Sequence, residues 1–256
     1  MTATVVIPAR FGSTRFPAKI LANRTGRPLV QHVVEQARKC RLVREVIVAT
    51  DDRRIFDALR PFETHCVMTS PNHQSGTDRV AEVARRLSDQ IIVNVQGDEP
   101  EIEPEVIDGL IERLSSSSDD MATAATPFPA GADPNDPNLV KVVTDQDGRA
   151  LYFSRSLIPF HRDATSPRSV PYYLHLGIYA YRREFLLRFA SLPPTPLELA
   201  EKLEQLRALE QGHRIQVLTV HRATHGIDTP EQYDEFVQRT MNHEDTKKKR
   251  PNAENA

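Results

Sequence analysis

The N-terminal half of the chain alternates short apolar runs with amphipathic stretches. The runs have the length of buried strands, and the stretches place apolar side chains three and four positions apart, as one face of a helix requires. The predicted strands are residues 4–7, 45–49, 66–68 and 91–95, and the predicted helices are residues 29–37, residues 52–59, one that starts near Asp78 and one that Pro104 opens. This alternation predicts an α/β fold, in which helices flank both faces of a mainly parallel sheet.

The C-terminal half has a different pattern, in which strand-like segments follow one another. Residues 139–144 and 150–153 flank the turn sequence Asp-Gln-Asp-Gly and predict a β-hairpin. Residues 173–181 alternate, so that His175 and Tyr179 share one face of a strand. The other predicted elements are a helix over 197–211 that Gly212 ends, a strand over 215–220, and a helix that begins with a capping box at 229–232.

Length, cysteine content and charge restrict the class of protein. A chain of 256 residues fits one large α/β domain, which we expect over 1–241, with a polar, disordered tail over 242–256. No apolar run approaches the ~20 residues that cross a bilayer, and no secretory signal is evident. The two cysteines are too few for a disulfide framework and indicate a reducing, cytoplasmic location. The net charge of -2 argues against nucleic acid or an anionic membrane as a partner.

A basic loop follows the first predicted strand. It carries three cations and two hydroxyl groups, which belong to Arg10, Arg15, Lys19, Ser13 and Thr14. A triphosphate needs such a set, because its negative charges are costly to desolvate without paired cations. The spacing is neither that of a P-loop nor that of a dinucleotide-binding fingerprint. A solvated surface loop is the alternative that the local chemistry leaves open.

Two carboxylates stand where a divalent cation could bind. Asp98 follows the strand 91–95, and ligands of α/β sheets bind beyond the carboxyl ends of the strands. Asp228 precedes the last predicted helix and could supply the partner that a lone carboxylate needs. Each has an ordinary alternative, since Asp98 could belong to an acidic turn and Asp228 could stabilise a helix N-terminus. A further acidic motif at 145–147 matches the D-x-D of glycosyltransferases but lies in the predicted hairpin turn.

Five polar residues of the second half could contact a second ligand. Arg155 has a planar guanidinium group suited to a carboxylate. His175 and Tyr179 are four residues apart on one strand, about 13 Å by strand rise, so we expect them at opposite ends of a ligand. Glu204 and Gln205 would reach in from a helix. On local sequence alone, a surface arginine and ordinary sheet residues are the simpler interpretation.

Seven motifs occur in one order along the chain. They are VVIPARFGSTRFPAKIL, HQSGTDRVAEV, IIVNVQGDEPEIEPEVI, LYFSRSLIPF, HLGIYAYRREFL, PLELAEKLEQLRALEQG and GIDTPEQYDEF. From about Thr4 to Arg239, the chain closely resembles the 3-deoxy-manno-octulosonate (KDO) cytidylyltransferases, or CMP-KDO synthetases. The resemblance implies a nucleotidyltransferase-like, Rossmann-like fold with a smaller hairpin-containing part for dimerisation and sugar binding. It also implies a homodimer, Mg²⁺, and the reaction of CTP with KDO that yields CMP-KDO and diphosphate for lipopolysaccharide biosynthesis.

The resemblance implies roles for individual residues. Those implied to bind the nucleotide are Pro8, Ala9, Arg10, Ser13, Arg15, Lys19, Gln74, Ser75, Gly76 and Arg79. Those implied to bind the sugar acid are Gln96, Arg155, His175, Tyr179, Glu204 and Gln205. Asp98 and Asp228 match the magnesium ligands, and with Arg10 and Lys19 they form the implied catalytic set. Ala18 stands where glycine is frequent in the family and Ile20 where proline is frequent.

Other functions remain compatible with the residues. A sister cytidylyltransferase acting on sialic acid or another sugar acid would share the basic loop. A nucleotide-binding module without catalysis would not need both carboxylates, and a glycosyltransferase would need a D-x-D after a strand, where this chain has Asp98-Glu99-Pro100. The sequence leaves open whether KDO or a modified KDO, such as an amino-sugar variant, is preferred.

Overall fold

The computed structural model describes residues 2–13, 15–162, 170–221 and 226–248. The strands are β1 (Ala3–Ala9), β2 (Val43–Thr50), β3 (Cys66–Met68), β4 (Ile91–Asn94), β5 (Met121–Pro127), β6 (Lys141–Thr144), β7 (Ala150–Ser154), β8 (Tyr173–Arg182) and β9 (Ile215–Thr219). The helices are α1 (Leu29–Ala37), α2 (Arg53–Leu59), α3 (Gly76–Ala84), α4 (Pro104–Ser115), α5 (Arg183–Phe189), α6 (Pro196–Glu201), α7 (Gln205–Glu210) and α8 (Pro230–Lys248), with short 3₁₀ turns η1 (Lys19–Leu21) and η2 (Arg60–Phe62).

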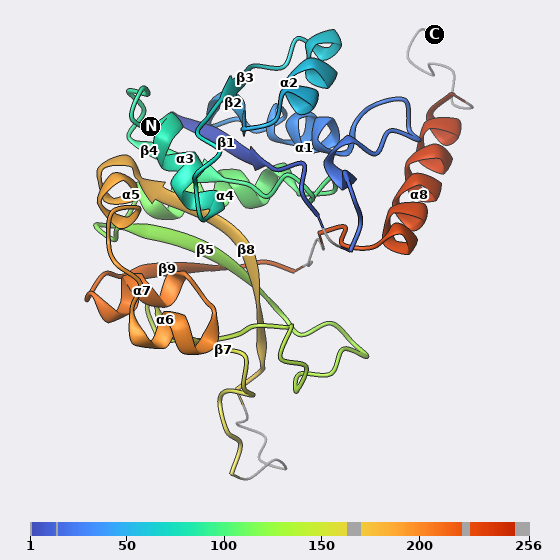
Figure 1. Ribbon diagram of the computed structural model, residues 1–256. Helices are drawn as coiled ribbons and strands as arrows, with labels where there is room; N and C mark the ends of the chain where they lie inside the picture. Colours follow the sequence, from blue (N-terminus) through green and yellow to red (C-terminus); the bar gives the residue numbers. More distant parts are fainter. Residues whose placement is uncertain (1, 14, 163–169, 222–225, 249–256) are drawn as a thin grey trace, which may run out of the picture.

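One sheet with the strand order β3-β2-β1-β4-β8-β5-β9 forms the centre of the molecule (Figure 1). The pairs β2–β3, β1–β2, β1–β4 and β5–β9 are parallel. Strand β8 runs antiparallel to both of its neighbours, β4 and β5. The expectation of a mainly parallel sheet is confirmed, with one reversed strand inside it.

Helices cover both faces of this sheet, as the alternation of strands and helices predicted. Apolar side chains of α1, α2 and α4 pack on one face, where Val5, Ile7 and Val93 point towards them. Those of α3, α5 and α7 pack on the other face, over Val6 and Ile47 among others. Successive residues of β1 therefore contribute to opposite cores, as the period of a strand requires.

The predicted hairpin forms, and it makes a smaller part beside the main sheet. Strand β6 pairs with β7 antiparallel, and Lys141 at its start also pairs with Leu174 of β8. The chain that follows β7 extends away from the body of the molecule (Figure 1). Large apolar side chains are exposed here, with Phe160 at 86% and Leu151 at 61%.

One predicted helix is wrong, and two other helices have bounds that differ by a few residues from the expected ones. The single helix expected over 197–211 is two helices, α6 and α7, because Lys202 adopts a left-handed conformation with φ 54°. Helix α3 begins at Gly76, before Asp78, because Ser75 and Asp78 form a reciprocal capping box. Helix α8 continues past residue 242 to Lys248, which lies within the segment expected to be a disordered tail. Residues 249–256 lie outside the described residues, and the single domain over 1–241 stays a prediction.

The last helix returns to the N-terminal half of the chain. Tyr233, Phe236 and Val237 of α8 form an apolar cluster with Ile227 and with Leu29 of α1. The backbone N–H of Ile227 also donates to the carbonyl oxygen of Asp98 at 2.8 Å. These contacts bring the segment before α8 to the end of β4. Within the described ranges, no helix has the length and apolar character that a bilayer crossing requires.

Candidate active site

Three segments meet at the carboxyl ends of β1 and β4. These strands are parallel neighbours, so the loops that follow them leave the sheet at the same edge. A pocket of about 150 Å³ lies between the two loops and the start of α3. It is lined by Pro8, Arg10, Gly12, Ser13, Lys19, Ile20, Gly76, Gln96, Gly97 and Asp98. The structure thus brings the basic loop and the first acidic motif to one place.

The two loops approach so closely that a side chain at Gly97 would not fit without adjustment. A Cβ atom there would lie 3.2 Å from the carbonyl oxygen of Pro8 and 3.3 Å from Cδ1 of Ile20. Both distances are tighter than ordinary contact. Glycine at this position therefore lets the end of β4 pack directly against the end of β1.

The backbone at Ala18 adopts a conformation that favours glycine. Its φ of 55° is left-handed, a conformation that costs a residue with a Cβ about 1–2 kcal/mol. The next residue, Lys19, begins the 3₁₀ turn η1. Alanine at this position therefore leaves the turn in place but strains the residue beside Lys19.

The ammonium group of Lys19 lies between the two predicted metal ligands. Its Nζ is 2.5 Å from Oδ2 of Asp98 and 2.9 Å from Oδ1 of Asp228, and it also donates to the carbonyl oxygen of Ile227 at 2.9 Å. Arg15 pairs with the other oxygen of Asp228 at 3.0 Å. Burial lowers the pKa of Lys19, but the two carboxylates outweigh burial and hold the pKa above its usual value. Lys19 is therefore charged in this cluster.

The carboxylate pair fits a magnesium ion whose other ligands are a substrate phosphate and water. Asp98 and Asp228 already converge on one cation, the ammonium of Lys19. Over the described part of the chain, no group of three or more His, Cys, Asp and Glu side chains could hold a metal without other ligands. Mg²⁺ commonly binds through one or two carboxylates together with water and substrate phosphates. The residues present match that mode of binding.

A second pocket, of about 410 Å³, begins where the first one ends. Its lining includes Asp228 and Gly226, so the two pockets adjoin at the carboxylate pair. The polar side chains that line it are Glu99, Asn138, His175, Tyr179, Gln205 and Asp228. Leu174, Leu176 and Leu203 supply apolar contact area. Such a mixture suits a polar ligand that presents several hydroxyl groups.

Gln205 has an amide group without a protein partner in this second pocket. The residue is 4% exposed, and its Nε2 donates to no partner among the residues that the structure describes. Leaving a buried donor unpaired costs about 1–3 kcal/mol. A ligand oxygen in the pocket would remove that cost. Gln205 is therefore poised to donate to a ligand.

His175 and Tyr179 do not lie at opposite ends of the pocket, as strand spacing predicted. Their ring centroids are 5.6 Å apart. The pairing with β5 shifts within this stretch, because Thr123 is opposite Tyr179 whereas the next residue, Ala124, is opposite Leu176. The bulge brings the two rings together. Burial lowers the pKa of His175 to about 3 and raises that of Tyr179, so both side chains stay neutral.

The sequence analysis gave no role to Glu99, although it lines the same pocket. Burial, and then the charge of neighbouring Asp98, raise the pKa of Glu99 to about 8. One signal was available in the sequence, since Glu99 is a second acid directly after the predicted metal ligand Asp98, beyond the end of a buried strand. The structure adds Glu99 to the site.

Comparison with known proteins agrees with this geometry. A family model described as cytidylyltransferase matches residues 4–215. A 3-deoxy-manno-octulosonate cytidylyltransferase of Geobacter sulfurreducens is 51% identical over 248 residues, which cover 93% of this chain and 99% of that protein. The chain belongs to the 3-deoxy-manno-octulosonate cytidylyltransferase family. A member from Solibacter usitatus is 48% identical over 88% of this chain and 89% of its own length.

Solved structures place the fold in the same family. A CMP:2-keto-3-deoxy-manno-octonic acid synthetase complexed with CTP superposes with a TM-score of 0.89 and 40% identity, over 95% of this chain and 100% of that one. A cytidylyltransferase from Leptospira borgpetersenii has a TM-score of 0.62 at 16% identity, over 93% of this chain and 85% of its own. The second likeness shows that the fold extends beyond this family.

Several residues implied by the family resemblance lie outside the two adjoining pockets. Gln74, Ser75 and Glu204 line a third pocket of about 560 Å³ on the other side of the α3 N-terminus. The carboxylate of Glu204 accepts from the hydroxyl group of Thr77, and burial raises its pKa. Gln96 lines the first pocket with the basic loop and not the second, where a sugar ligand was expected.

The terminal guanidinium nitrogens of two implied arginines are hydrogen-bonded to the protein. Arg79 is 1% exposed, pairs with Asp51 at 2.8 Å and with Thr69 at 2.5 Å, and lines neither of the two adjoining pockets. Its expected contact with the nucleotide stays a prediction. Arg155 donates to the carbonyl oxygens of Glu201, Pro137 and Lys202 at 2.6, 2.8 and 3.4 Å. It lies outside the lining of the second pocket. A role for Arg155 in binding the sugar carboxylate stays a prediction.

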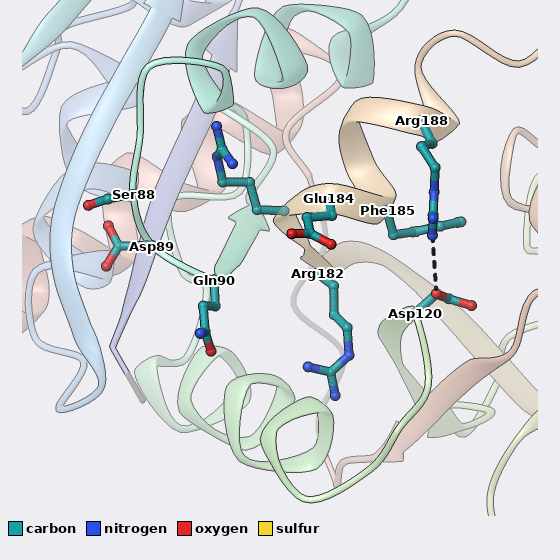
Figure 2. A pocket seen from close by; sticks show the side chains of 9 residues that line it. Ser88, Asp89, Gln90, Asp120, Arg182, Glu184, Phe185 and Arg188 are labelled. Atoms are coloured by element: carbon teal, nitrogen blue, oxygen red, sulfur yellow. Dashed lines mark ion pairs between the residues drawn. The ribbon is translucent and has the colours of Figure 1, made fainter.

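A pocket of about 480 Å³ beside the start of β4 and the end of β8 is rich in charge, and its arginines are bound to protein groups (Figure 2). Arg188 points towards Asp120 at 3.9 Å, and Figure 2 marks this ion pair. Arg182 and Arg183 donate to backbone carbonyls of Leu114 and Ala84, near the ends of two helices. These arginines stabilise helix C-termini. The candidate active site is therefore the pair of pockets at the carboxyl edge.

Proposed function

We propose that this chain transfers the cytidylyl group of CTP to KDO and releases diphosphate. The observation that carries the proposal is that the first pocket, with its basic loop, and the second pocket, with its polar lining, meet at Lys19, Asp98 and Asp228. Relatives about half identical to the chain bear the name of this activity, and a structure at 40% identity was solved with CTP. The product would serve lipopolysaccharide biosynthesis.

The residues of the two pockets position the reactants and offset charge. The anomeric 2-hydroxyl of KDO attacks the α-phosphorus of CTP in line with the bond to the leaving diphosphate. Arg10 and Lys19, which line the first pocket, offset the charge that develops on that leaving group. Asp98 and Asp228 would hold Mg²⁺, which when bound neutralises phosphate charge and lowers the pKa of the attacking hydroxyl. Gln205 and His175 hold the sugar acid in the second pocket.

Hydroxyl recognition distinguishes KDO from simpler acids. A site that hydrogen-bonds a hydroxyl group rejects an analogue that lacks it, because the protein group is left unpaired. Gln205 supplies such a group, since its buried amide has no protein partner among the described residues. Whether an amino-sugar variant of KDO is accepted equally well is a question for the assay.

The test is diphosphate release from CTP and KDO in the presence of Mg²⁺, with each reactant omitted in turn. Replacing KDO with sialic acid tests the sister activity, and release without any sugar acid would indicate hydrolysis. A matched control is Asp147→Asn, which changes an exposed carboxylate in the hairpin turn that pairs with Arg149. Wild type and control should be equally active, whereas absence of release with KDO but activity with sialic acid would overturn the proposal.

We also propose that the chain forms a homodimer through the part that contains β6 and β7. Phe160 and Leu151 support this, because large apolar side chains so exposed mark contact surfaces. Analytical ultracentrifugation of wild type and Phe160→Asp tests it, with Leu197→Asp on α6 as the control, since Leu197 is also exposed. A wild-type monomer at all concentrations would refute the homodimer.

A cytoplasmic location is part of the same proposal. Cys40 and Cys66 are both free, and burial raises the pKa of each thiol, which suits a reducing compartment. Neither nucleic acid nor a membrane surface is expected as a partner at a net charge of -2. Cell fractionation with an antibody against the chain checks the location.

A further inference from the structure

Thr123 of β5 lies beside His175 of the second pocket, where it contacts the bulge in β8. The side chain is 0% exposed. Its Oγ1 is 2.9 Å from Nε2 of His175, 2.8 Å from the carbonyl oxygen of Ile178 and 3.2 Å from the carbonyl oxygen of Leu176. Thr123 thus links the ring of His175 to the backbone of the strand that carries it.

The hydrogen atoms in this cluster can be assigned from chemistry. A threonine hydroxyl group has one hydrogen to donate, and both carbonyl oxygens can only accept. The hydrogen of Thr123 therefore points to the backbone, in particular to the nearer oxygen of Ile178. The contact with His175 then requires that Nε2 of the ring carries a hydrogen and donates it to Thr123.

The same assignment leaves Nδ1 of His175 without a hydrogen. Burial lowers the pKa of His175 to about 3, so the ring is neutral and carries only one N–H. Within the described ranges, no side chain or backbone group is hydrogen-bonded to Nδ1, and the ring lines the second pocket. Nδ1 is therefore a fixed acceptor.

We propose that Thr123 is a positioning residue, which holds His175 in the Nε2–H tautomer and so presents Nδ1 to accept a hydrogen bond from a hydroxyl group of the sugar acid. The proposal rests on the proposed function for the identity of the sugar acid. It adds an acceptor to the pocket, where Gln205 supplies a donor. Because threonine is β-branched, its side chain has few rotamers. The protein therefore fixes the tautomer of His175 before any ligand binds.

Thr123→Val tests the inference because valine keeps the shape of the side chain and removes the hydroxyl group. The KM for KDO should rise roughly 3- to 10-fold, the size of one lost hydrogen bond, while the KM for CTP stays within twofold. Thr123→Ser keeps the hydroxyl group and should restore the KM for KDO. Thr126→Val is the matched control, since Thr126 is buried on the same strand but lies opposite Leu174.

The tautomer itself is measured by NMR of protein with ¹⁵N-labelled histidine. His175 is assigned by the resonances that His175→Asn removes, since the chain has nine histidines. Wild type should show a protonated Nε2 and an unprotonated Nδ1 without ligand, and Thr123→Val should show a mixture. A protonated Nδ1 in wild type, or a Thr123→Val enzyme with an unchanged KM for KDO, would overturn the inference. The wild-type tautomer decides the matter even if valine prevents folding, and it does so independently of whether KDO is the substrate.

Discussion

Replacing Lys19 with methionine should let the carboxylate pair bind a divalent cation more tightly in the absence of nucleotide. The ammonium group lies 2.5 Å from Asp98 and 2.9 Å from Asp228, where a metal ion held by both would also lie. A cation that binds there must first displace these contacts. Methionine keeps the apolar stem of the side chain and removes the charge.

The contacts of Lys19 set the expected size of the effect. A hydrogen bond between charged groups contributes about 1.5–3 kcal/mol. Because the side chain of Asp228 is 41% exposed, water screens its share, and we count only the contact with Asp98. Since about 1.4 kcal/mol changes Kd tenfold, Lys19→Met should bind the cation roughly 10- to 100-fold more tightly.

The assay uses Mn²⁺ in place of Mg²⁺, because the paramagnetic resonance signal of free Mn²⁺ falls when the ion binds. Wild type, Lys19→Met and the control Lys39→Met are titrated without nucleotide; the ammonium of Lys39 contacts the side chain of Gln36 on the surface of the molecule. Adding CTP to wild type should bring its Mn²⁺ affinity closer to that of Lys19→Met, because the triphosphate can bind the ammonium group in place of the two carboxylates. Equal or weaker Mn²⁺ binding by Lys19→Met would refute the view that the ammonium and the metal compete.

Three further predictions concern the same edge of the sheet. Asp98→Asn and Asp228→Asn should each nearly abolish diphosphate release and leave the circular dichroism spectrum unchanged, because each removes a charged oxygen ligand of the metal; near-normal turnover at modest Mg²⁺ contradicts the assignment. Since the folded state raises the pKa of Glu99 from 4.5 to about 8, the stability that this carboxyl contributes is fully present below pH 4.5 and is lost as the pH rises through 8. In thermal unfolding with a chelator present, the melting temperature of Glu99→Gln should therefore rise relative to that of wild type between pH 5 and 9. A difference in melting temperature that does not change with pH would contradict this. Ala18→Gly should stabilise the fold by ~0.5 kcal/mol, because relief of about 1–2 kcal/mol of strain at φ 55° is partly offset by the flexibility of glycine in the unfolded chain; a loss of stability in denaturant titrations would contradict this.

Local pattern was enough to find the strands and helices that build the nucleotide side of the molecule. The run 91–95 stands out because a parallel strand buried on both faces is apolar throughout. Helix α1 was predicted with its observed bounds, Leu29–Ala37, because its apolar residues repeat at helical spacing. The order of the seven motifs along the chain also indicated the family.

The sequence could not reveal features that depend on distant partners or on unusual backbone. No glycine or proline marks the break at Lys202, whose left-handed φ separates α6 from α7. The bulge in β8 depends on pairing with β5, so alternation alone placed His175 and Tyr179 too far apart. The ion pair of Arg79 joins it to Asp51, which is 28 positions away, so the sequence did not show that its guanidinium group has a protein partner. In each case the deciding interaction lies outside the local window.

The return of the last helix to the first loop has a consequence for synthesis of the protein. Asp228 contacts Lys19 across 209 positions of the chain. A ribosome that adds ~5–20 residues per second needs about 10–40 s to make that stretch. The basic loop and Asp98 therefore exist long before their second carboxylate, and the apolar cluster around Leu29 stays open for the same time. Translation that stops early leaves a chain that lacks Asp228 and exposes that apolar surface to proteases.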